Sequence, residues 1–219
     1  MINDIKLGFK LMKHGLQFKT TVLCVVLFVL GGIMAGIADD EFSLSGFAFV
    51  MAAIMGYQLV QSVTCSTMVQ SSPQKKKLQT TVSTICTWVC MMIFNTILVV
   101  VNVISMHTNH IAESIVSGGL VLDAAFVLTI IVYMVVAMKM FWFAVIVMAG
   151  GFGGGYGVLL SVMSRTDFVI EAPISLGGAI AISYLAVFVG CGLMYLISLA
   201  LYKKDFSKST FESALKRAK

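Results

Sequence analysis

Residues 80–105 read TTVSTICTWVCMMIFNTILVVVNVIS, a stretch without Asp, Glu, Lys or Arg. A helix needs about 20 consecutive apolar residues to cross a bilayer, so this stretch is long enough to span one. Its apolar residues run continuously instead of alternating with polar ones, which favours a helix over a barrel strand. Five further apolar stretches cover residues 20–37, 43–64, 121–138, 141–163 and 174–201. The sequence therefore predicts an all-α membrane protein with six transmembrane helices.

The composition excludes an ordinary soluble domain. Of the 219 residues, 59% are hydrophobic and 11% are charged, whereas soluble domains carry roughly 25% charged residues. The five cysteines match neither a zinc ligand set nor a disulfide framework. The net charge of +5 comes from lysines that flank the apolar stretches and do not gather with aromatic residues, so we expect no nucleic-acid partner.

The basic residues predict the orientation of the chain. All 15 of them except Arg165 lie in residues 1–19, at 75–77, at Lys139 or in residues 203–219. Cytoplasmic flanks of membrane helices are enriched in Lys and Arg. We therefore expect a multi-pass protein of the cell membrane with both termini in the cytoplasm.

The boundary between the fourth and fifth stretches depends on Lys139, because little else separates residues 121–138 from residues 141–163. One long bent helix over both stretches would leave five spans and an external C-terminus. The basic C-terminal residues favour six spans instead.

Residues 1–19 predict an amphipathic helix at the membrane surface. At helical spacing, Ile5, Phe9, Met12 and Leu16 share one side, and Lys6, Lys10 and Lys13 share the opposite side. A simple basic anchor for the first span is an alternative of about equal weight. The tail at residues 203–219 is expected to be cytoplasmic, with a short surface helix near its end.

A cleaved signal peptide is the alternative for the N-terminus, because Gly36-Ile37-Ala38 resembles a small-residue cleavage site. The basic region before the first apolar stretch is long, and that stretch has the length of a full span. We therefore expect the first helix to be retained.

The connection between the second and third spans, residues 65–79, reads CSTMVQSSPQKKKLQ. A short apolar and polar segment is followed by Ser71-Ser72-Pro73, where proline breaks a helix, and then by Lys75, Lys76 and Lys77. This connection resembles the coupling region of small ABC-2-type permeases. With the amphipathic N-terminal segment and the six spans, the resemblance covers essentially the whole chain.

The resemblance implies a type V exporter-like fold, with an elbow helix at 1–19, a transmembrane domain at 20–202 and a cytoplasmic tail at 203–219. It implies a permease that forms a homodimer and binds two copies of a separate ABC ATPase, although pairing with a related permease stays open. The residues implied to couple to the ATPase are Met68, Val69, Gln70, Ser71, Ser72, Pro73, Lys75, Lys76 and Lys77.

The chain contains no G-x-x-x-x-G-K-[ST] phosphate loop. We therefore expect no cofactor and no enzymatic activity in this chain, with ATP and Mg bound by the partner ATPase. The small size and the Ser-Ser-Pro connection look most like Gram-positive exporters of amphipathic or antimicrobial peptides, of the phenol-soluble modulin type. This resemblance implies an amphipathic peptide as the substrate.

Glycines and one acidic residue are the remaining candidates for helix packing or gating. The glycines of the fifth apolar stretch have small-xxx-small spacing, which predicts close helix packing and outweighs a likeness to a potassium-channel filter. Asp123 is expected either to reach water at the end of the fourth span or to act in gating. The candidates are Gly150, Gly151, Gly153, Gly154, Gly155, Gly157 and Asp123.

Two smaller groups of polar residues have alternative interpretations. Asn95 and Asn102 lie on one face of the third span and predict hydrogen bonds between helices. A metal site is one interpretation of three residues near the third span, His107, His110 and Glu113. The alternative is an ordinary solvated loop, because loops with two histidines are common.

Two other classes of function stay open beside an exporter permease. An ion- or proton-coupled carrier usually has midplane carboxylates and interrupted helices in matching halves, and no clear internal repeat is present. A non-transporting membrane scaffold would not need the basic connection at 65–79.

Overall fold

A computed structural model describes residues 2–15, 18–38, 44–64, 67–140, 146 and 173–203 of the chain. These residues form helices and no strand, which confirms the prediction of an all-α fold for this part of the chain. The elements are α1 (Ile2–Lys13), α2 (Phe18–Ala38), α3 (Leu44–Thr64), α4 (Thr67–Gln70), α5 (Lys75–Lys77), the π-helix η1 (Leu78–Val82), α6 (Ser83–Thr108), α7 (Glu113–Lys139) and α10 (Leu176–Ala200).

Five helical segments of the described chain are long and apolar enough to cross a membrane. They are α2, α3, the continuous segment Lys75–Thr108, α7 and α10. The predicted fifth span at 141–163 lies almost wholly outside the described residues, so the count of six spans stays a prediction.

Helix α7 begins at Glu113, earlier than the predicted boundary at residue 121. The Glu113 side chain accepts a hydrogen bond of 2.8 Å from the backbone N–H of Leu176, at the start of α10. The sequence boundary was wrong because Gly118 and Gly119 interrupt the apolar run without ending the helix.

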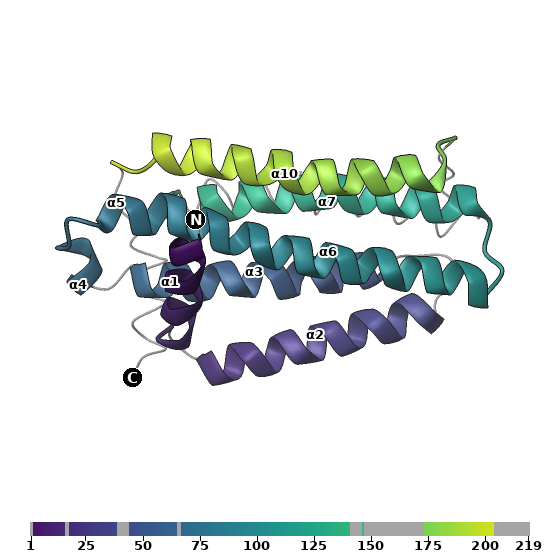
Figure 1. The fold of residues 1–219 in the computed structure, drawn as a ribbon, viewed down its shortest axis with the longest axis horizontal. Helices are drawn as coiled ribbons and strands as arrows, with labels where there is room; N and C mark the ends of the chain where they lie inside the picture. Colours follow the sequence, from purple (N-terminus) through teal and green to yellow (C-terminus); the bar gives the residue numbers. More distant parts are fainter. Residues whose placement is uncertain are drawn as a thin grey trace.

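The long helices lie side by side, with α10 and α7 along one side of α3 and α6 and with α2 along the other side (Figure 1). Buried residues of α3, α6, α7 and α10 form the largest apolar cluster, which includes Tyr57, Met91, Ile131 and Met194. Helix α2 packs on α3 and α6 through Phe49, Leu98 and Val101. Most of α2 stays exposed in the isolated chain, as expected for a helix that faces lipid.

The small-xxx-small pair in α2 makes an intrachain contact. A Cβ at Gly32 would lie 3.2 Å from the side chains of Ala48 and Phe49, and one at Gly36 would overlap the side chain of Val101. Small residues at both positions therefore let α2 pack closely on α3 and α6.

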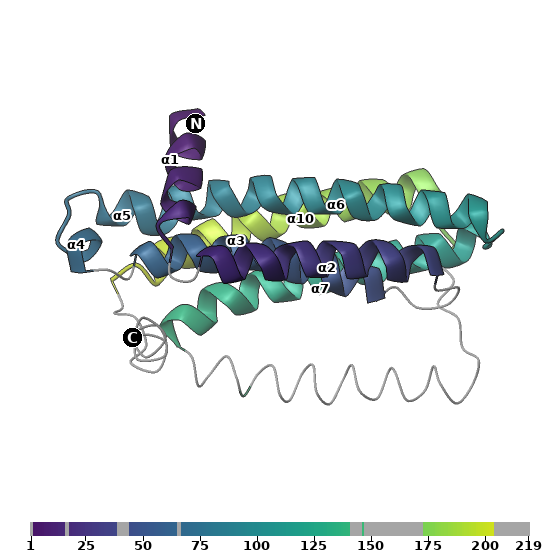
Figure 2. The ribbon, with the colours of Figure 1, turned by 90° about the horizontal axis from the view of Figure 1, so that it is seen from below.

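The basic residues of the described chain gather at one end of the bundle. Helix α1, the connection between α3 and α6, and the C-terminal ends of α7 and α10 all lie there (Figure 1). We call this the basic end, because it carries Lys75–Lys77, Lys139 and Lys203. Helix α1 runs across the bundle and stands nearly perpendicular to the long helices (Figure 2). A helix in that direction would lie along the surface of a membrane that the long helices cross.

Candidate functional site

The connection between α3 and α6 forms a turn that extends past the end of the bundle (Figure 1). The backbone N–H of Ser72 donates to the carbonyl of Val69 (3.1 Å), and the N–H of Lys75 donates to the carbonyl of Ser72 (3.0 Å). The Ser72 hydroxyl accepts from the N–H of Gln74 (3.2 Å). Pro73 is exposed within this turn, where its missing N–H costs no hydrogen bond.

Buried polar side chains fix the base of this connection. Gln61 donates through Nε2 to the hydroxyl of Ser83 (2.8 Å), which joins α3 to α6. The Thr64 hydroxyl donates to the carbonyl and to the side-chain oxygen of Gln61, both at 2.8 Å. Gln70 of α4 donates to the carbonyl of Thr64 (2.6 Å). The exposed turn is therefore attached to α3 and α6 through a hydrogen-bonded base.

Two lysines of the connection contact other elements at the basic end. The Lys77 ammonium lies 2.6 Å from the Asp4 carboxylate of α1. This contact lowers the pKa of Asp4 below its ordinary value, mainly through the hydrogen bond from Lys77. Lys76 lies over the ring of Tyr202, with its Nζ 5.9 Å from the ring centroid, just past the end of α10. A displacement of the connection would therefore act on α1 and α10 as well as on α3 and α6.

Helix α1 is docked on the bundle by the side that carries Gly8 and Met12. Met12 packs with Leu59, Val60 and Cys86, and a Cβ at Gly8 would lie 2.7 Å from Cys86 Sγ. The predicted apolar side of α1 is therefore divided, because Met12 faces the bundle whereas Phe9 is exposed. Lys6, Lys10 and Lys13 are exposed too, as the amphipathic pattern predicts. Leu16 lies outside the described residues.

Asp123 is buried in α7, with 5% of its surface exposed. A Cβ at Gly46, in the first turn of α3, would overlap its carboxylate. The amide groups at a helix N-terminus favour a negative charge, so this contact suits a carboxylate. The expectation that Asp123 reaches water at a membrane interface is wrong for this structure, and its role in gating stays a prediction. The glycines from Gly150 to Gly157 lie outside the described residues.

Of the two asparagines predicted to bond between helices, Asn95 has a partner on another helix, whereas the side-chain nitrogen of Asn102 has no hydrogen-bond partner in the described chain. Ser183 of α10 donates to the side-chain oxygen of Asn95 in α6 (2.8 Å), a hydrogen bond between helices of the predicted kind. No group of three His, Cys, Asp or Glu residues in the described chain could hold a metal ion, and this includes His107, His110 and Glu113.

Sequence reasoning missed three residues of the basic end. Asp4 is the one acid among residues 1–19, which marks it as unusual but does not identify Lys77 as its partner. No sequence motif marks Tyr202 or Gln79. Their positions at the basic end depend on how distant helices pack. Comparisons with known protein families, characterised proteins and solved structures found no match to this chain.

Proposed function

We propose that this chain is the permease subunit of an exporter driven by a separate ABC ATPase. The observation that carries the proposal is the described part of the basic connection, residues 67–79, which extends past the bundle (Figure 1). It contacts Thr64 of α3, Asp4 of α1 and Tyr202 just past the end of α10. A partner that displaced this connection would move several helices at once. The exposed part of the connection offers that partner a rigid turn at Pro73 and a positive surface at Lys76 and Lys77.

The substrate and the assembly follow from the resemblance to small ABC-2-type permeases. Two copies of the chain would bind two ATPase subunits, and the pair would move an amphipathic peptide outward across the cell membrane of a Gram-positive bacterium. Helix α1 supports this arrangement, since its direction and exposed lysines suit an elbow helix on the cytoplasmic leaflet.

Purification of the tagged chain from its native membranes tests the proposal. We expect an ATPase with a phosphate loop to copurify, and we expect amphipathic peptides to stimulate its hydrolysis after reconstitution. Replacing Lys75, Lys76 and Lys77 by Gln together with Pro73→Ala should remove most of the bound ATPase. The control is a variant in which Gln replaces Lys6, Lys10 and Lys13. This variant loses the same number of positive charges at the same end of the bundle. Equal ATPase recovery with both variants would overturn the assignment of the connection.

One observation favours a proton-coupled carrier as a second candidate. Asp123 is a buried carboxylate within a predicted span, and such groups often bind protons or ions in carriers. In that case, Asp123→Asn should abolish the dependence of transport on a proton gradient, and no ATPase should copurify.

A further inference from the structure

Helix α6 carries a row of buried polar groups that have no hydrogen-bond partner in the described chain. They are the Thr84 hydroxyl, the Trp88 indole N–H and the side-chain N–H groups of Asn95 and Asn102. At about 100° per residue, these four positions fall within an arc of about 40° on one side of α6. We call them the polar stripe. From its first residue to its last it is about 27 Å long, which is close to the thickness of the hydrocarbon core of a bilayer.

The polar stripe differs from the other buried hydroxyls of α6. Thr87 is also buried, but its hydroxyl donates to the carbonyl of Ser83 (2.9 Å). Asn95 is 5% exposed, and its side-chain nitrogen has no acceptor in the described chain. Buried polar groups without partners are rare, and polar groups inside a membrane usually face protein or a water-filled space. The polar stripe therefore needs acceptors that the present arrangement of helices does not supply.

The polar stripe contacts α10 at two levels. The ring of Trp88 lies 5.6 Å from the ring of Phe188, centroid to centroid, and Asn95 accepts a hydrogen bond from Ser183 (2.8 Å). Asn95 also lines a small cavity among apolar side chains of α3, α7 and α10, with room for at most about one water molecule. A larger ligand can therefore reach the polar stripe only after α10 has moved away from α6.

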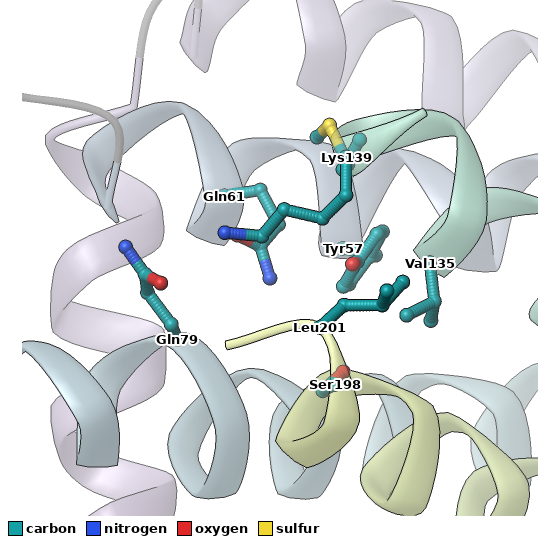
Figure 3. A pocket seen from close by; sticks show the side chains of 8 residues that line it. Tyr57, Gln61, Gln79, Val135, Lys139, Ser198 and Leu201 are labelled. Carbon is teal, nitrogen blue, oxygen red and sulfur yellow. The ribbon is translucent and has the colours of Figure 1, made fainter. Parts of the chain in front are cut away.

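The polar stripe and the basic connection belong to one helical segment. The segment Lys75–Thr108 is continuous through α5, η1 and α6. Near its start lies Gln79, another buried side chain whose amide atoms have no partner in the described chain, and it lines a small recess together with Gln61 (Figure 3). Lys76 of the same segment contacts Tyr202, just past the end of α10. A partner that displaced the connection would therefore act on both α6 and α10.

We propose that the polar stripe lines the path through which an amphipathic peptide crosses the membrane. When α10 moves away from α6, the groups of the stripe donate hydrogen bonds to water and to the carbonyl oxygens of the peptide. Three of the four groups are N–H donors that cannot accept, so they select a ligand rich in acceptors, as a peptide backbone is. The identity of the ligand rests on the proposed exporter function, whereas the opening of the stripe to water does not.

Thiol accessibility tests the opening of the polar stripe. Asn95→Cys and Asn102→Cys are made in the full-length chain and treated in living cells with aminoethyl methanethiosulfonate, and each modified cysteine is identified by mass spectrometry. Val101→Cys is the matched control, because Val101 is as buried as Asn95 and packs against Gly36 of α2. We expect the two stripe thiols to react and the Val101→Cys thiol to stay unmodified.

Substitutions that remove donors test the ligand. Thr84→Val replaces a hydroxyl by a methyl group, and Trp88→Phe removes an N–H but keeps an aromatic ring beside Phe188. Both remove buried groups without partners, so the double variant should fold. In the complex with its ATPase, it should raise the peptide concentration at half-maximal ATPase stimulation about tenfold, the effect of one or two lost hydrogen bonds. Thr87→Val is the matched control and should leave that concentration unchanged, because the Thr87 hydroxyl is satisfied within α6.

Two results would overturn the proposal. If the stripe thiols are as unreactive as the Val101→Cys thiol, the polar stripe does not open to water. If the double variant responds to peptide as Thr87→Val does, the peptide does not contact the stripe. Failure of the exporter proposal gives a different result, because the stripe thiols would then react although no ATPase copurifies.

Discussion

The ion pair between Asp4 and Lys77 joins two segments that lie far apart in the sequence. Because Lys77 lowers the pKa of Asp4 in the folded chain, the carboxylate adds stability above its ordinary pKa of 3.8. This contribution is lost as the pH falls through the lowered folded-state pKa. Asp4→Asn should therefore have a lower melting temperature than the native chain at neutral pH, and the difference should vanish in acid.

The effect of Asp4→Asn should be small, because 54% of the Lys77 side chain is exposed and water screens the pair. Added salt should reduce the difference further. A difference that stays constant across pH and salt would show that the substitution acts through packing and not through charge.

Gly46 and Asp123 make a close contact between α3 and α7. Gly46→Ala would force the buried carboxylate to move, and overpacking of this kind costs about 1–3 kcal/mol. We expect a corresponding fall in the free energy of unfolding, measured by denaturation in detergent. Gly119→Ala is the control, because a Cβ there meets nothing within 4 Å. Equal stability of the two variants would contradict the contact.

Single side chains were hard to predict because their partners come from distant helices. The apolar surroundings of Asp123 in the sequence identified it as costly, but nothing in the sequence places it against Gly46. The interhelical role of Asn95 was predictable, since an amide in an apolar span needs a partner from another helix.

At the scale of the element, the docking of α1 depends on a small residue at Gly8. Gly8→Val would push α1 away from Cys86, which the structure buries completely. We expect faster modification of Cys86 by a maleimide, with the labelled cysteine identified by mass spectrometry.

Gly31→Val is the matched control for α1, because a Cβ at Gly31 in α2 meets nothing within 4 Å. Its Cys86 should react as slowly as that of the native chain. Fast Cys86 labelling in the native chain itself would contradict a stably docked α1.

The long helices were predictable because length and hydropathy decide whether a segment can cross a bilayer. The start of α7 was not predictable from the sequence. Its first turns contain glycines, and the Glu113 carboxylate accepts a hydrogen bond from the start of α10. The π-helix η1 was not predicted either. The residues Leu78–Val82 show no local pattern that separates a π-helical from an α-helical turn.

At the scale of the whole molecule, the basic end is the feature that the sequence predicted best. Each predicted cytoplasmic connection within the described chain lies at that end of the bundle. The rule behind this prediction is simple, since successive spans must alternate in direction. The order in which the helices pack was not predictable, because their apolar faces are chemically alike.

The orientation of the chain in the membrane is the central claim, because an ATPase can reach the connection at 65–79 only from the cytoplasm. Gln74→Cys places a thiol in the exposed turn, and Thr108→Cys places one at the opposite end of the bundle. Both variants are labelled in cells with a membrane-impermeant maleimide, and the labelled thiol is identified by mass spectrometry. The account predicts that the Thr108→Cys thiol reacts in intact cells and that the Gln74→Cys thiol reacts only after permeabilisation. Labelling of the Gln74→Cys thiol in intact cells would contradict it.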